Sequence, residues 1–260
     1  MRLKSLVFCL ALLQIRASIF LEGMQRDSNR PYLQRQLYEK PKTIHEAAHR
    51  GNLKRVQELV QQGMGINKTD LKNGDTALHV AALKGHDHVV DWLIRSGAQI
   101  DAQDRLGSSP LMLAALQGHT STVRLLLERD AQIDHQNTDG NTALSAAAIN
   151  GHTPTVRLLL EKGAQIDHQS KNGNSALSAA AIKGHTSTVE LLLDWAQAQG
   201  IDVEALVNQQ NKQGQTPLML AALQVHTATV RLLLDRGAQV NQQDKEGRTA
   251  LMGLLCIKSR

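Results

Sequence analysis

Residues 140–172 read GNTALSAAAINGHTPTVRLLLEKGAQIDHQSKN, and this stretch predicts how most of the chain folds. A short helix is expected over 143–149, because Thr142 is a good N-cap and Gly151 favours the turn that ends a helix. A second helix follows, with an apolar stripe at i, i+3 and i+4 spacing. Gly163 ends it and leads into a polar, extended loop. Such a unit is too thin to bury its apolar face unless it stacks on copies of itself.

The same unit recurs along the chain with a period of 33 residues. One interval is 41 residues, because eight extra residues lie within DWAQAQGIDVEAL after Asp194. We expect these residues to prolong the second helix, to break it at Gly200 and to form a capped turn at Asp202, as a protrusion on the convex back. Trp195 is expected either to pack on its own repeat or to contact a partner. The glycines that mark the period are Gly74, Gly107, Gly140, Gly173, Gly214 and Gly247.

Two stretches, GDTALHVAALKGHDHVVDWLIRSGAQIDAQD and GQTPLMLAALQVHTATVRLLLDRGAQVNQQD, closely resemble the ankyrin repeat. The resemblance implies an all-α ankyrin-repeat solenoid of helix-turn-helix-loop units stacked side by side. The expected divisions are an apolar segment at 1–20, a polar basic linker at 21–41 and an ankyrin-repeat domain at 42–260, which comprises a degenerate first repeat at 42–73, five full repeats at 74–246 and a partial repeat at 247–260.

Three places depart from the repeat pattern. Asp130 stands where the second helix normally ends in Gly, so it must adopt a left-handed conformation at some cost. Val225 replaces a turn Gly, which predicts a strained or shifted turn. The first repeat lacks a Thr-Pro-Leu entry. None of these departures alters the expected fold.

The composition argues against nucleic-acid binding by the repeats. Of the net charge of +5, residues 1–40 carry +4, so the repeats are almost neutral. Aromatic residues make up only 2% of the chain, which leaves few side chains to stack on bases. We therefore expect no nucleic-acid partner.

The first eighteen residues have the layout of a secretory signal peptide, with two basic residues before an apolar run at 6–13. The run is too short to span a membrane. The cleavage site is poor, because Ile15 and Arg16 stand where small residues are required. The alternative is an N-terminal helix that stays on the chain. We expect residues 1–20 to be retained and the protein to be cytoplasmic, with export as the alternative.

The histidines suggest a metal site at first sight, because five occupy one repeat position. Zinc ligands must lie about 2 Å from one point, whereas equivalent positions in stacked repeats are about 10 Å apart. We therefore expect these histidines to bond backbone groups at the turn, and we expect no metal and no cofactor. No nucleophile or phosphate-binding motif is present, so no catalytic residue is expected. The five histidines are His86, His119, His152, His185 and His226.

The resemblance implies a scaffold or adaptor that binds a partner protein through the concave face formed by first helices and loop tips. The alternatives are a substrate-docking subunit of an enzyme complex and a truncated repeat chain without function. An aliphatic stripe flanked by amides and lysines suits a mixed protein interface, although the stripe could instead pack between repeats. The expected binding residues are Leu83, Leu116, Ile149, Ile182 and Leu223 in the stripe, Lys84, Gln117, Asn150, Lys183 and Gln224 beside it, and Arg105, Leu106, Ser108, Thr138, Asn141, Lys171 and Asn174 in the loops.

The partial repeat at 247–260 contains one predicted helix without its partner. The last full repeat is therefore expected to leave apolar surface exposed. We expect fraying of these residues or self-association through this end.

Overall fold

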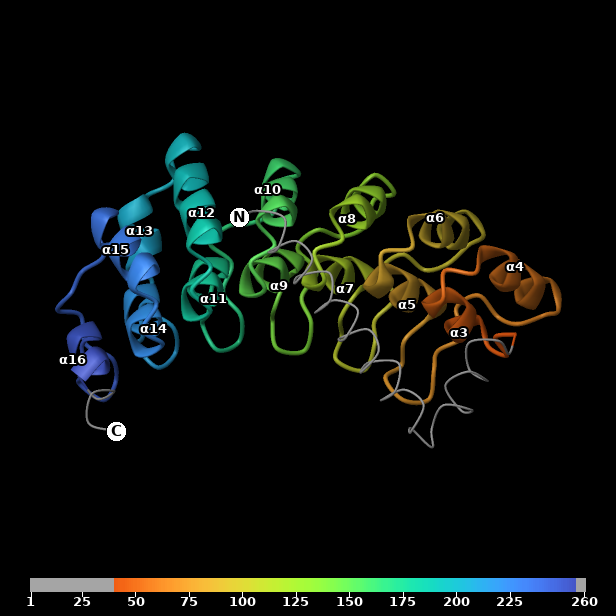
Figure 1. The fold of residues 1–260 in the computed structure, drawn as a ribbon, viewed down its shortest axis with the longest axis horizontal. Helices are drawn as coiled ribbons and strands as arrows, with labels where there is room; N and C mark the ends of the chain where they lie inside the picture. Colours follow the sequence, from red (N-terminus) through yellow and green to blue (C-terminus); the bar gives the residue numbers. More distant parts are fainter. Residues whose placement is uncertain (1–39, 256–260) are drawn as a thin grey trace, which may run out of the picture. The chain divides into compact units, whose positions relative to one another are not determined.

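The structure is a computed structural model that describes residues 40–255, with side chains placed through residue 252. The chain divides into two units, 1–41 and 42–260, and the second contains the repeats (Figure 1). The signal-like segment and most of the linker lie outside the described residues. Within residues 40–255 all regular structure is helical, which confirms the all-α expectation. No helix in that part of the chain is long and apolar enough to cross a membrane.

The helices form two rows, with the connecting loops projecting from the row of first helices (Figure 1). Neighbouring helices within each row pack side by side in chain order. The first helices are α3 (Ile44–His49), α5 (Ala77–Lys84), α7 (Pro110–Leu116), α9 (Ala143–Ile149), α11 (Ala176–Ile182), α14 (Pro217–Leu223) and α16 (Ala250–Leu255). The second helices are α4 (Leu53–Gln61), α6 (Asp87–Arg95), α8 (Thr120–Leu127), α10 (Thr153–Glu161), α12 (Thr186–Ala198) and α15 (Thr227–Asp235), and the short α13 (Val203–Val207) follows α12.

The first helices begin at hydroxyl caps, as the sequence predicts. In α9 the Thr142 hydroxyl accepts a hydrogen bond from the Ser145 backbone N–H, which satisfies one of the unpaired donors of the first turn. The first repeat, expected to lack its usual entry, still has such a cap: Thr43 accepts from the Glu46 N–H, and Ile44 stands where other repeats have Pro or Ala. The degenerate repeat thus begins in the same way as the others.

From α5 to α14, the second residue of each first helix is a buried leucine, and a pair of alanines in the same helix is buried as well. Leu144 and Leu177 are buried, and Ala147 and Ala148 are fully buried between neighbouring helices. The alanines allow close approach of the helices, and each buried leucine contributes about 2 kcal/mol of burial free energy. Leucine and alanine therefore fill most of the core in a chain of which only 2% is aromatic.

The five repeated histidines bond backbone, as predicted, but the acceptor lies in the preceding repeat. The His152 Nε2–H donates to the Leu116 carbonyl at 3.1 Å, and His185 donates to Ile149 at 3.0 Å. The imidazole packs on the turn glycine of that repeat. A Cβ at Gly184 would lie 2.4 Å from His226 Nδ1, and Gly184 has a φ of +70°. Glycine is therefore required there both for its conformation and for its size.

Asp130 and Val225, two of the predicted departures from the repeat pattern, both have positive φ, 65° and 59°. The structure thus confirms the left-handed conformation of Asp130 and the strain at Val225. Val225 occupies the position of Gly184, but no histidine follows at the equivalent of His226 in the next repeat, because His226 is the last histidine of the sequence. Its side chain is 51% exposed, so it has room, and only the backbone is strained.

The extra residues prolong α12 to Ala198, Gly200 turns the chain with a φ of +69°, and Asp202 caps α13. These features were predicted. Ala196 is fully buried and Trp195 is half-buried against the core, so the start of the insertion belongs to the core. Only the later part, around residues 197–202, is exposed as a protrusion should be.

The partial repeat forms a single helix, α16, within the described residues. Leu251 and Met252 on it are 63% and 48% exposed, and Leu234 and Val240 in the last full repeat are also exposed. Apolar surface is therefore exposed at this end, as expected. Fraying and self-association stay predictions.

Candidate functional site

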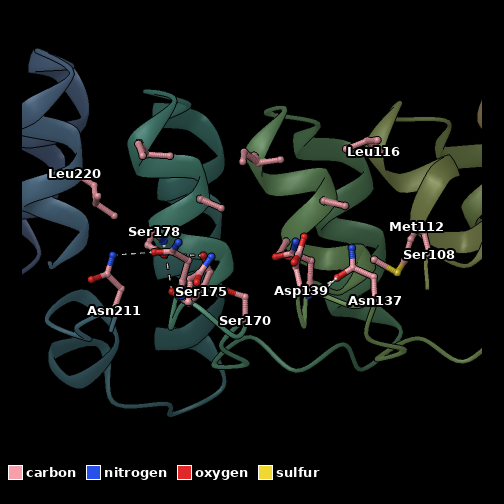
Figure 2. Close-up of a pocket in the computed structure, with 18 of the residues that line it drawn as sticks. Ser108, Met112, Leu116, Asn137, Asp139, Ser170, Ser175, Ser178, Asn211 and Leu220 are labelled. Carbon is pink, nitrogen blue, oxygen red and sulfur yellow. Dashed lines mark hydrogen bonds between the residues drawn. The ribbon is translucent and has the colours of Figure 1, made fainter. Parts of the chain in front are cut away.

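A groove of about 650 Å³ lies between the first helices and the loops of the middle repeats. It runs from α7 to α14, and the side chains that line it come from both helices and loops (Figure 2). We call this feature the groove. Its lining residues are Ser108, Met112, Leu113, Leu116, Asn137, Asp139, Asn141, Ser145, Ala146, Ile149, Ser170, Asn172, Asn174, Ser175, Ser178, Ala179, Ile182, Asn211, Gln213, Gln215 and Leu220.

The helical wall of the groove is aliphatic. Leu116, Ile149 and Ile182 stand at the same position in three successive first helices, and each is half-buried. These side chains line the groove, and the rest of their surface is covered by the protein. Binding of a partner by the stripe stays a prediction.

Two of the first helices that line the groove carry small side chains. Helices α7 and α14 have the sequence PLMLAAL, whereas α9 and α11 have ALSAAAI. At the third position Ser replaces Met, and at the fourth position Ala replaces Leu. Because the backbone is shared, these smaller side chains leave space that Met and Leu fill in the flanking repeats. The sequence of α9 and α11 thus produces the groove.

The loop wall of the groove is rich in amides, and alternation along each loop explains which residues face it. In the loop before α11, Ser170, Asn172 and Asn174 line the groove, and the intervening Lys171 does not. The same pattern puts Asn137, Asp139 and Asn141 in the lining but leaves Thr138 out. Neighbouring loops are joined by backbone bonds, such as that from the Lys171 N–H to the Asp139 carbonyl at 2.8 Å. The wall is therefore held in place by the stacking of the repeats.

Internal hydrogen bonds determine which amide groups remain available in the loop wall. The Asn211 Oδ1 accepts two backbone N–H groups, from Gln213 and Gln215, both at 2.9 Å. Its NH₂ group must then donate to Asn174 Oδ1 at 3.1 Å and Gln215 Oε1 at 3.2 Å (Figure 2). Asn137 Oδ1 likewise accepts from two backbone N–H groups, at 3.0 and 2.9 Å. The NH₂ groups of Asn137, Asn174 and Gln215 therefore remain as unused donors among the described residues.

Asp139 is the one charged residue in the lining of the groove. It is exposed, and its carboxylate makes no hydrogen bond or ion pair with other described residues. The equivalent positions in the next two repeats hold Asn172 and Gln213, which are neutral. A single negative charge thus marks the loop wall beside α9.

The structure brings six of the predicted binding residues together in the groove: Ser108, Leu116, Asn141, Ile149, Asn174 and Ile182. Ser108 is buried at 7% exposure, so it supports the wall more than it offers a contact surface. The remaining predicted residues lie outside the lining: Leu83, Lys84, Arg105, Leu106, Gln117, Thr138, Asn150, Lys171, Lys183, Leu223 and Gln224. The middle three residues of the predicted stripe therefore line the groove, whereas its two outer residues and most of the predicted loop and flanking residues do not.

Sequence reasoning missed two groups of lining residues. The small residues Ser145, Ala146, Ser178 and Ala179 were visible as the difference between ALSAAAI and PLMLAAL. The loop residues Asn137, Asp139, Asn172 and Gln213 could have been found from the two-residue alternation along an extended loop, which puts Thr138 and Lys171 on the other side. Both signals require a comparison of repeats at equal positions.

Outside the groove, His79 is the buried titratable side chain at the position that Ser occupies in α9 and α11. Burial lowers the pKa of His79 below its ordinary value of 6.5, although hydrogen bonding to the Ser108 carbonyl works in the opposite direction. The Nδ1 atom of His79 accepts a hydrogen bond from the Thr76 N–H at 3.1 Å, and Nε2–H donates to the Ser108 carbonyl at 3.0 Å, which links α5 to the next loop. No group of three or more His, Cys, Asp or Glu that could hold a metal occurs among the described residues.

Comparisons with known proteins agree with this architecture. A family model described as ankyrin repeats, which itself comprises three copies of the repeat, matches this chain over four overlapping segments. The segments are residues 27–104, 44–137, 111–206 and 199–256. The chain belongs to the ankyrin-repeat family. The ankyrin-repeat fold is typically a non-catalytic module for protein–protein interaction.

Among curated relatives, human ankyrin repeat domain-containing protein 40 is 36% identical over 72 residues, which are 28% of this chain and 20% of that protein. Serine/threonine-protein kinase 12 of Arabidopsis thaliana is 40% identical over 63 residues, or 24% of this chain and 14% of that protein. The matched regions thus span a fifth or less of these relatives, and the similarity lies in the repeats.

Solved ankyrin-repeat domains match over most of the chain. The human ASB11 ankyrin repeat domain superposes with a TM-score of 0.70 at 27% identity, over 83% of this chain and 97% of that one. The ankyrin repeat domain of Bcl-3 gives a TM-score of 0.66 at 31% identity, over 83% and 95%. These similarities confirm the stacked helical architecture.

Proposed function

We propose that this ankyrin-repeat protein is a scaffold or adaptor that binds a partner protein through the groove. The observation that carries the proposal is the groove itself, with an aliphatic wall on one side and an amide-rich wall on the other. Protein interfaces commonly combine an apolar centre with a polar rim that supplies hydrogen bonds. The groove has both in a form held by the stacked repeats, so little ordering is needed on binding.

The positions of Leu116, Ile149 and Ile182 support this proposal. They are half-buried, so their inner atoms are fixed by packing while their outer atoms stay accessible. A fixed side chain loses little conformational entropy when a partner covers it. The lining holds no Lys or Arg, which supports a protein partner over a nucleic acid.

Affinity capture with matched variants tests the proposal. Ala146→Glu puts a charge into the lining of the groove, at a half-buried position on α9. Ser187→Glu puts the same charge on an exposed position of α12, outside the groove, and serves as the control. We expect wild type and Ser187→Glu to retain the same bound proteins and Ala146→Glu to lose them, with similar melting temperatures for all three. Retention of the same partners by Ala146→Glu would contradict the proposal.

The same experiment separates the alternatives. A docking subunit of an enzyme complex would bring down an associated activity that Ala146→Glu removes. A repeat chain without function would retain no partner in any variant, even at high protein concentration.

A further inference from the structure

We infer that the groove accepts an extended aliphatic segment of the partner protein. This segment is flanked at one end by a single basic residue, which meets Asp139. This inference rests on the proposed function and specifies what binds there. It follows from three properties of the lining: its unused donors, the small side chains of α9 and α11, and its single carboxylate.

The unused donors indicate a ligand rich in carbonyl groups. The oxygens of Asn137, Asn174 and Gln215 are occupied by bonds within the loops, so these residues offer NH₂ groups to the groove. An extended peptide presents a backbone carbonyl on the same side at every second residue. Such a backbone can therefore lie along the loop wall and accept hydrogen bonds from successive repeats.

The small side chains indicate where the ligand's own side chains go. Ala146 and Ala179 stand where Leu113 and Leu220 stand in the flanking repeats, so the groove is wider at α9 and α11 by the space of those leucines. The surrounding wall is aliphatic, with Ile149 and Ile182 nearby. A small aliphatic side chain from the partner fills this space and restores the packing that the flanking repeats have.

The charges indicate the polarity of the ligand. The groove lining contains no cation and one carboxylate, Asp139, whose side chain has no hydrogen-bond or ion-pair partner among the described residues. A negatively charged ligand finds no counter-charge in the lining, and a charge placed over the aliphatic wall loses hydration without compensation. A basic side chain at the Asp139 end is the arrangement that complements the lining.

A displayed library of random twelve-residue peptides, selected on the full chain, tests this inference. We expect the selected peptides to share three or four small aliphatic residues followed or preceded by Lys or Arg. The double variant Ala146→Leu/Ala179→Leu gives these helices the residue that α7 and α14 already carry, so the fold is expected to tolerate it. We expect it to bind the selected peptides about tenfold more weakly or worse, because the space is filled.

Asp139→Asn is the matched test of charge, because Asn is the residue at the equivalent position of the next repeat. We expect the variant to bind the basic peptides about two- to fivefold more weakly, as for an exposed ion pair, and to lose the preference for Lys or Arg in a repeated selection. Thermal melting of each variant separates loss of binding from loss of folding.

Selected peptides that are acidic, or that bind the variants and the wild type equally, would overturn the inference, and so would a selection that enriches no sequence. These results leave the proposed function standing if Ala146→Glu still loses its captured partners. Failure of that capture test, by contrast, counts against the proposed function itself.

Discussion

The two central repeats, which contain α9 and α11, differ from the repeats that contain α7 and α14 at two main positions of the first helix. The central repeats have Ser and Ala where the flanking repeats have Met and Leu. The caps, the buried leucine, the alanine pair and the turn geometry are shared, apart from Val225. The shared features therefore specify the fold, and the two variable positions of the first helix shape the surface of the groove.

Substitutions in the turn after the first helix are expected to change the free energy of unfolding most. The turn residue contributes to the stacking of repeats only where a histidine of the next repeat packs on it. Gly184→Ala would put a Cβ 2.4 Å from His226 Nδ1 at a φ of +70°. We expect it to lower the free energy of unfolding by about 3 kcal/mol, from strain and overpacking together. Val225→Gly, at the same position in a flanking repeat, should raise it by about 1 kcal/mol, because it removes only backbone strain.

Urea unfolding monitored by circular dichroism measures both changes. Effects of the same sign at Gly184 and Val225 would contradict the account of the histidine contact.

The variable positions are expected to have a smaller effect on stability. Ala146→Leu/Ala179→Leu makes the central repeats resemble their neighbours and adds partly buried apolar surface. We expect the free energy of unfolding to stay the same or rise by about 1 kcal/mol. A loss of more than about 1 kcal/mol in urea unfolding would show that the small residues are required for packing.

The shared features were predictable from one sequence because each has a local cause. The period, the hydroxyl caps such as Thr142 and the glycine turns each leave a signal within a few residues, and the structure confirms them. Of the predicted stripe, Leu116, Ile149 and Ile182 lie in one wall of the groove, and Leu83 and Leu223 lie outside the lining.

The rest of the candidate site depends on non-local geometry. Asp139 lines the groove and Thr138 and Lys171 do not, because only one side of each loop faces the helices. The hydrogen-bond acceptor of each repeated histidine lies in another repeat, 36 residues away for His152. Neither fact is contained in a single repeat, so family resemblance at equal positions gave only an approximate site.

Stability should also depend on pH through His79, which the central repeats replace by Ser. Burial lowers the pKa of His79 in the folded chain below 6.5, and burial, with nearby cations, lowers the pKa of His49 in the same direction. Below about pH 6.5 the unfolded chain therefore binds more protons, and stability falls as pH falls from there; above it this contribution is constant.

His79→Ser should flatten the pH dependence of the urea midpoint between pH 7 and pH 5, whatever its effect on the midpoint at pH 7. An unchanged slope would show that His79 does not titrate differently on folding.

The smallest expected effect is a difference in amide hydrogen exchange between the partial repeat and the central repeats. We expect amides at 247–255 to exchange faster than those at 140–190, because Leu251 and Met252 are largely exposed while the central helices are packed on both sides. Hydrogen exchange at several protein concentrations distinguishes the two proposals for this end: fraying gives fast exchange throughout, and self-association gives protection that grows with concentration. Protection equal to that of 140–190 in a proven monomer would rule out both.

Site-specific photo-crosslinking tests the central claim, that the central repeats provide the binding surface, most directly. A photoreactive amino acid at Asn172, an exposed lining residue of the groove, is compared with one at Ser187, an exposed residue outside it. We predict that Asn172 forms a crosslink to a partner protein in cells, that Ser187 does not, and that Ala146→Glu abolishes the Asn172 crosslink. A partner captured equally from both positions, or only from Ser187, would contradict the account.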